Sequence, residues 1–124
     1  MEEIGSRAFR NCKSLMCEIA LPHSLKRIED SAFYSSAIKG NLALPEGLEY
    51  IGEQAFEYCS GLTGSLTIPK GIKTISRFAF SCCGFTGNLT LPMGLTKIQS
   101  SAFSDTKFKG ELNIATSDEI IETR

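Results

Sequence analysis

Cysteine is the most reactive residue type in this chain, but the number and spacing of the cysteines argue against a metal site and a disulfide framework. The 124 residues include five Cys and a single His, His23. Zinc sites draw on C-x-x-C pairs and additional His ligands, and the chain has no C-x-x-C pair. An odd cysteine count, with no basic and apolar leader at the start, also argues against a disulfide framework. We therefore expect no metal and no cofactor.

The thiols fall into two kinds when the sequence is aligned with itself. Cys82 takes a position that is variable elsewhere in the chain, so we expect it to face solvent. His23 follows Pro22 in a turn that is equally variable, and we expect it in solvent as well. The remaining aligned cysteines share one small-residue position with Ser and Thr, namely Cys12, Ser36, Cys59, Cys83 and Thr106. That position suits buried free thiols, although a disulfide between Cys59 and Cys83 of adjacent units is geometrically conceivable.

Composition restricts the classes of partner. Thirteen basic and fourteen acidic residues give a net charge of -1, so no charge surplus attracts nucleic acid or an anionic membrane. Apolar runs are far shorter than the roughly 20 residues that span a bilayer, so we expect no membrane insertion. With 42% hydrophobic residues the chain fits one small folded domain. Its location is cell-surface or secreted if it is an excerpt of a longer exported protein, and cytoplasmic if it is complete.

A repeat of 23 to 24 residues organises the whole chain. The motif Ile-x-x-x-Ala-Phe occurs five times, and its Phe residues are Phe9, Phe33, Phe56, Phe80 and Phe103. Pro keeps step with it at Pro22, Pro45, Pro69 and Pro92. Such a period indicates that the units stack on one another and bury matching side chains together.

Each unit also carries a form of the segment Gly-x-Leu-x-Leu-Pro, in which two apolar residues, Leu or Ile, lie two apart; Cys17 replaces the Gly in the first unit and Ala115 the Pro in the fifth. That spacing predicts one short strand per unit with one face buried, ended by the Pro. Stacking then pairs these strands in parallel, while Leu-x-x-Ile and Ala-Phe aim inward from an irregular or short-strand return side. We predict a solenoid of about five repeats.

Residues 62 to 83, Leu-Thr-Gly-Ser-Leu-Thr-Ile-Pro-Lys-Gly-Ile-Lys-Thr-Ile-Ser-Arg-Phe-Ala-Phe-Ser-Cys-Cys, resemble the leucine-rich repeat of BspA-like surface proteins. Pro after the strand, Ala-Phe on the return and Cys three residues later carry the resemblance, which extends from Ile4 to Ile114. It implies a right-handed coil with the parallel sheet on its concave face. We expect one domain, 1–124, with uncapped ends and repeats at about 4–27, 28–50, 51–74, 75–97 and 98–121.

Members of that family adhere to host proteins, matrix components or other cells, which implies a non-enzymatic adhesion or protein-interaction module. We expect the ligand to bind the outward side chains of the concave sheet, with no catalytic residue. Those side chains are Glu18, Asn41, Ala43, Ser65, Thr67, Asn88, Thr90, Glu111 and Asn113. Two alternatives stay open. One is head-to-tail self-association into a repeat assembly, and the other is a thiol-dependent enzyme centred on Cys82 and His23.

Overall fold

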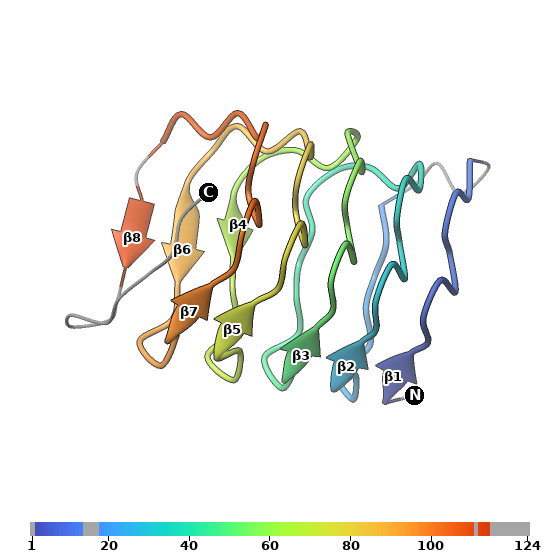
Figure 1. Cartoon of the computed structure of the whole chain (residues 1–124), viewed down its shortest axis with the longest axis horizontal. Coiled ribbons are helices and arrows are strands. Elements are labelled where there is room, and N and C mark those ends of the chain that lie inside the picture. The colour runs from blue at the N-terminus through green and yellow to red at the C-terminus, as the bar shows by residue number, and fades with distance from the viewer. Residues whose placement is uncertain (1, 14–17, 111, 115–124) are drawn as a thin grey trace.

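The chain winds into successive coils that lie side by side (Figure 1). The computed structural model describes residues 2–13, 18–110 and 112–114. In that part it has eight short strands and no helix, and every strand pair is parallel. The strands are β1 (Glu3–Ile4), β2 (Arg27–Ile28), β3 (Tyr50–Ile51), β4 (Leu66–Thr67), β5 (Thr74–Ile75), β6 (Leu89–Leu91), β7 (Lys97–Ile98) and β8 (Leu112–Ile114). Short parallel strands in register are consistent with the predicted repeat solenoid. We number the coils 1 to 5 by the Phe of their Ala-Phe pair.

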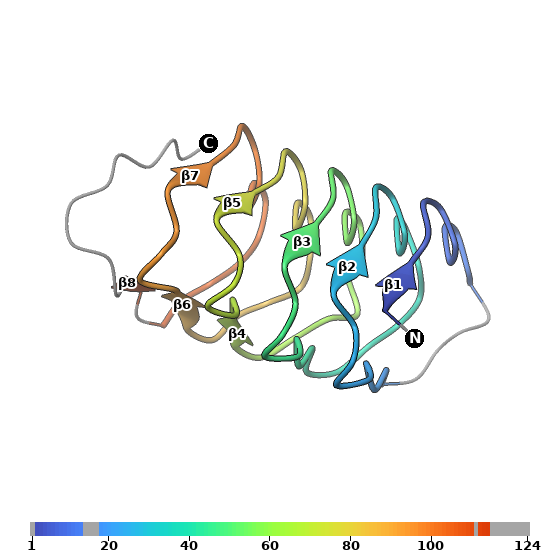
Figure 2. The same cartoon turned by 90° about the horizontal axis from the view of Figure 1, so that it is seen from below.

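The strands form two rows on different sides of the coils (Figure 2). The sheet β4-β6-β8 follows the Leu-x-Leu segments, as predicted for coils 3 to 5. The prediction of one such strand in every coil is wrong for coils 1 and 2, where the described residues 18–21 and 41–44 form no strand. Leu21 and Leu44 are only half-buried there, whereas Leu91 is buried, so the inward anchor is weaker.

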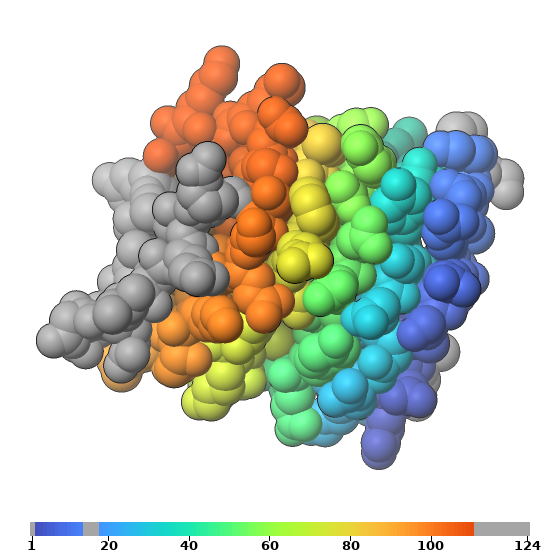
Figure 3. Space-filling view, in the orientation of Figure 1, coloured from blue at the N-terminus to red at the C-terminus, as the bar shows by residue number. Residues whose placement is uncertain are grey.

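The second row agrees with the short-strand alternative left open for the Leu-x-x-Ile segments. It consists of β1-β2-β3 and β5-β7. Each of these strands is two residues long and has a single buried residue, the Ile, so it cannot show the alternation that reveals a strand in a sequence. Figure 3 views this side of the molecule, where each coil forms a band across the surface.

A spine of stacked phenylalanines fills the coils, and this prediction is confirmed. Ring centroids of Phe9, Phe33, Phe56, Phe80 and Phe103 lie 5.2, 5.1, 5.4 and 5.6 Å apart in turn. Neighbouring rings are within 10° of parallel. The alanines before Phe33, Phe56, Phe80 and Phe103 are fully buried, which leaves no room for a longer side chain.

The rest of the return side, residues 5–12 and their equivalents, is a regular series of tight turns, whereas an irregular or short-strand return side was expected. In coil 2 the backbone N–H groups of Ser31, Phe33 and Ser35 each donate to a carbonyl of coil 3, at 2.8 to 2.9 Å. Two residues per coil have φ between 54° and 64°, which turns these N–H groups toward the next coil. Phe78 holds one of these positions and is half-buried.

Candidate functional site

The predicted ligand-binding residues form two columns that run across the coils, one on each side of the first apolar residue of the Leu-x-Leu segments. The first column packs against the glycines that begin these segments. Glu18, Asn41, Ser65 and Asn88 are all exposed. A Cβ added at Gly40, Gly64, Gly87 or Gly110 would overlap the Glu18, Asn41, Ser65 or Asn88 side chain respectively. Each polar side chain therefore lies over the glycine of the following coil. Gly40 and Gly64 also have φ of 90° and 79°, a conformation that favours glycine.

The Ser65 side chain of this column also joins two coils by a hydrogen bond. The backbone N–H of Asn88 donates to Ser65 Oγ at 2.8 Å. A side chain that accepts from the next coil and covers its glycine has a packing role, whatever else it contacts. The first column thus holds the coil spacing on this side of the molecule. Glu111, the fifth member, lies outside the described residues.

The second column offers threonine hydroxyls that no described residue uses. Thr67 pairs in register with Thr90, and Thr90 with Asn113 on β8. Ala43 and Thr67 are exposed and Thr90 is half-buried. Neither threonine hydroxyl makes a hydrogen bond to another described residue. A hollow of about 300 Å³ lies beside this column, lined by Leu42, Ala43, Leu44, Glu46, Ser65, Thr67 and Pro69.

The inward cysteines are buried free thiols in coils 3 and 4, as predicted. Cys59 Sγ donates to the Phe33 carbonyl at 3.0 Å, and Cys83 Sγ donates to the Phe56 carbonyl at 3.1 Å. Burial raises the pKa of Cys59 to about 12 and raises the pKa of Cys83 well above its ordinary value. The prediction is wrong for Cys12, which is partly exposed because coil 1 has a neighbouring coil on one side only.

The two residues of the alternative thiol enzyme are not brought together. His23 is exposed in the turn after the Leu-x-Leu segment of coil 1, while Cys82 lies on the return side of coil 4. Cys82 is half-buried, and its Sγ lies 3.9 Å from Asp105 Oδ2. Across the described residues, no group of three or more His, Cys, Asp or Glu side chains could hold a metal ion.

Comparison with known families identifies the repeat. Residues 1–109 match the family described as "BspA type Leucine rich repeat region (6 copies)". The chain belongs to the BspA-type leucine-rich-repeat family. No curated protein and no solved structure matches it. BspA-type repeats suggest a protein-interaction or adhesion module, and leucine-rich repeats are generally non-enzymatic.

Two further features bear on what this BspA-type chain can contact. The described residues include no helix that is long and apolar enough to cross a membrane. A second hollow lies on the other row of strands, between coils 3 and 4, and has charged side chains on both rims. The sequence does hold a signal for it, since acidic residues of coil 3 align with basic residues of coil 4. That signal becomes meaningful only once the coils are stacked.

Proposed function

We propose that the chain is a non-enzymatic adhesion or protein-interaction module whose ligand, a protein, binds the sheet β4-β6-β8 as the concave face of a solenoid. The observation that carries the proposal is the second column, Ala43, Thr67, Thr90 and Asn113. Its two threonines stand in register, and their hydroxyls make no hydrogen bond to another described residue. A hollow of about 300 Å³ lies next to Thr67. Family membership supports the same class of function.

The two columns have different roles on this face, one in packing and one in binding. Glu18, Asn41, Ser65 and Asn88 hold the coil spacing through the glycines beside them, and we place Glu111 in the same group by register. The second column then meets the ligand, with short side chains that let a partner's backbone approach closely. A partner with exposed peptide groups or hydroxyls can satisfy the free threonine hydroxyls without a charge of its own.

The composition of this face favours weak contacts that add up over many coils. Binding hot spots are enriched in Tyr, Trp and Arg, and the sheet residues named above include none of these. Linking several weak sites raises the apparent affinity by roughly 10²- to 10⁴-fold without any new contact. We therefore expect measurable adhesion when the module is displayed in several copies, to a host, matrix or other cell-surface protein.

A binding assay on an arrayed form tests the proposal. Biotinylated protein held four to a streptavidin is applied to a panel of immobilised purified matrix proteins. The double variant Thr67→Lys/Thr90→Lys should weaken the strongest response at least about tenfold, because two long cations block the face and lose the hydroxyl contacts. Retained folding is checked by circular dichroism.

The matched control is Thr96→Lys. Thr96 is exposed on the opposite row of strands, and its equivalents in coils 2 and 4 are already Lys26 and Lys73. This variant should bind like the parent. Equal loss in both variants, or unchanged binding in the double variant, would contradict the placement of the ligand. A panel without any response from the arrayed parent would contradict the function.

A further inference from the structure

The second row of strands is interrupted between coils 3 and 4. β3 pairs with β2, and β5 with β7, but β3 and β5 are not paired with each other. Elsewhere the residue after the Ile donates its backbone N–H to the Ile of the preceding coil, as Gly52 does to Ile28 at 2.8 Å. Here the Ser76 hydroxyl donates to the Ile51 carbonyl instead, at 2.7 Å. We call this interruption the seam.

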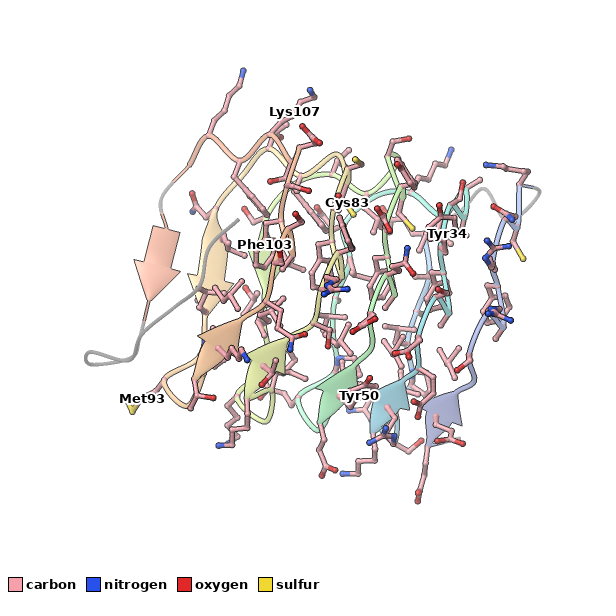
Figure 4. The ribbon with its side chains drawn as sticks, in the orientation of Figure 1. Tyr34, Tyr50, Cys83, Met93, Phe103 and Lys107 are labelled. Carbon is pink, nitrogen blue, oxygen red and sulfur yellow. The ribbon has the colours of Figure 1, made fainter. Side chains whose placement is uncertain are left out.

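The seam opens onto a polar hollow of about 430 Å³, larger than the one on the Leu-x-Leu side. Its lining consists of Glu49, Tyr50, Glu53, Lys73, Thr74, Ser76 and Gln99. Figure 4 places Tyr50 on β3 at this side of the molecule. A smaller, adjoining hollow of about 220 Å³ shares Glu53 and Gln99 with the 430 Å³ hollow and is also lined by Arg77 and Lys97. The two hollows together cross coils 3 to 5.

The rims of the seam carry opposite charge. Glu49 and Glu53 stand on the coil 3 rim, with Lys73 and Arg77 at the matching positions of coil 4. All four side chains are exposed, and none makes an ion pair, since the one ion pair in the described part of the chain joins Arg27 to Glu29. In the described part of the chain, two carboxylates of coil 3 and two cations of coil 4 thus line the hollows at the seam without pairing with one another.

Hydrogen bonds within the protein determine which polar atoms of the lining can still bind a ligand. Gln99 Oε1 accepts from the Arg77 backbone N–H at 3.1 Å, which leaves the Gln99 amide N–H₂ free to donate into the hollow. The Tyr50 hydroxyl is already committed to Asp30, at 3.0 Å. The larger hollow therefore offers two carboxylates, the Lys73 cation and an amide donor, and the adjoining hollow adds the Arg77 cation.

We propose that the seam binds a short zwitterionic peptide of two or three residues. Its ammonium group lies toward Glu49 and Glu53, its carboxylate toward Lys73 and Arg77, and Gln99 donates to a carbonyl between them. Adjacent coils lie about 5 Å apart, and an extended peptide residue spans about 3.5 Å. Two or three residues therefore separate the two charges by about one to two coil spacings. A ligand with only a negative charge would be repelled by the two glutamates, and a ligand with only a positive charge would be repelled by Lys73 and Arg77.

Trialanine is a suitable probe, titrated into the 15N-labelled full chain at low salt and followed by NMR chemical shifts. Exposed charge contacts are individually weak, so we expect a dissociation constant of millimolar order. Shifts should centre on residues 49–53, 73–77 and 99. N-acetyl-trialanine amide, which lacks both charges, should bind at least about tenfold more weakly.

Variants separate the two ends of the peptide. Glu53→Gln and Arg77→Gln should each weaken trialanine binding about three- to fivefold. Glu46→Gln and Lys70→Gln, exposed charges outside the seam, should leave it unchanged. The proposal is overturned if trialanine causes no shifts up to about 20 mM, if the capped peptide binds equally, or if the control variants weaken binding as much. These outcomes do not involve Thr67 or Thr90, so they are independent of the proposed ligand face.

Discussion

Single side chains in this protein are constrained by what the next coil places beside them. A larger residue at Gly64 is strained because φ is 79° there, and the Asn41 side chain would have to move to make room for its Cβ. Cys59 fits its position because a small donor is needed opposite the Phe33 carbonyl, 3.0 Å away. In both cases the deciding neighbour is more than twenty residues distant in the sequence.

The buried thiols should make the fold sensitive to alkali. The pKa of Cys59 is about 12 in the folded protein because burial disfavours the thiolate, against 9.0 for a free thiol. A folded-state pKa above the unfolded value contributes stability that is complete below pH 9 and is lost as the pH rises toward 12. Each such thiol lowers the free energy of unfolding by up to about 1.4 kcal/mol per pH unit within that window.

Urea unfolding of the parent and Cys59→Ser at pH 7, 9 and 10.5 measures this effect. Ser is the natural residue of coil 2 at the same position, Ser36, and it keeps a hydroxyl donor. The two proteins should lose different amounts of stability between pH 9 and 10.5, with the parent losing about 2 kcal/mol more. Parallel pH profiles would show that Cys59 ionises equally in both states.

At the scale of the element, the turns of the return side depend on residues that tolerate a left-handed backbone. Ser31 has φ of 58° and donates its N–H to Glu53 of the next coil at 2.9 Å. Ser31→Gly should change the free energy of unfolding by less than about 1 kcal/mol, because glycine adopts this φ freely. Ser31→Val should cost about 1–3 kcal/mol, since a β-branched residue is strained there.

Ser60→Val is the matched control for this prediction. Ser60 is exposed and its φ is not positive, so valine should be tolerated there within about 0.5 kcal/mol. The free energy of unfolding from urea titration, followed by tyrosine fluorescence, compares all three variants with the parent. Equal losses for the two valine variants would contradict a role for backbone strain.

The elements differ in how visible they are in the sequence. The Ala-Phe pairs repeat identical letters and the Leu-x-Leu segments repeat Leu or Ile, so stacked Phe rings and parallel pairing could be predicted and are confirmed. The strands of the second row could be given only as one of two alternatives, because each has one buried residue and no alternation. The left-handed turns were also hidden, since Gln54, Tyr58 and Phe78 are not turn residues by type.

The candidate site divides in the same way. Alternation along the Leu-x-Leu segments predicts which side chains point outward, such as Ser65 and Thr67, and both are exposed. It does not predict that Ser65 would accept a hydrogen bond from coil 4 while Thr67 stays free. That difference arises only when one coil lies on another, as does the alignment of Glu53 with Arg77 at the seam.

At the scale of the whole molecule, stability should depend on where a coil stands in the stack. Each unit contacts its neighbours and little else, so a central side chain is enclosed from both sides and a terminal one from a single side. Phe56 is fully buried between rings at 5.1 and 5.4 Å. Phe9 is half-buried and stacks on Phe33 alone.

Phe56→Ala should therefore cost about 3–5 kcal/mol, the usual loss for a buried Phe that leaves a cavity. Phe9→Ala should cost about 1–2 kcal/mol, because less apolar surface is exposed and solvent can fill the space. Both changes in the free energy of unfolding are measured by urea unfolding. The fluorescence of Tyr34, Tyr50 and Tyr58 reports the transition, because the chain has no Trp. Because the proposed ligand face on β4, β6 and β8 is held by the same stack, Phe56→Ala should also weaken the proposed adhesion of the arrayed protein, and Phe9→Ala should not. Equal destabilisation by the two variants would mean that the chain unfolds from a core that does not follow the order of its coils.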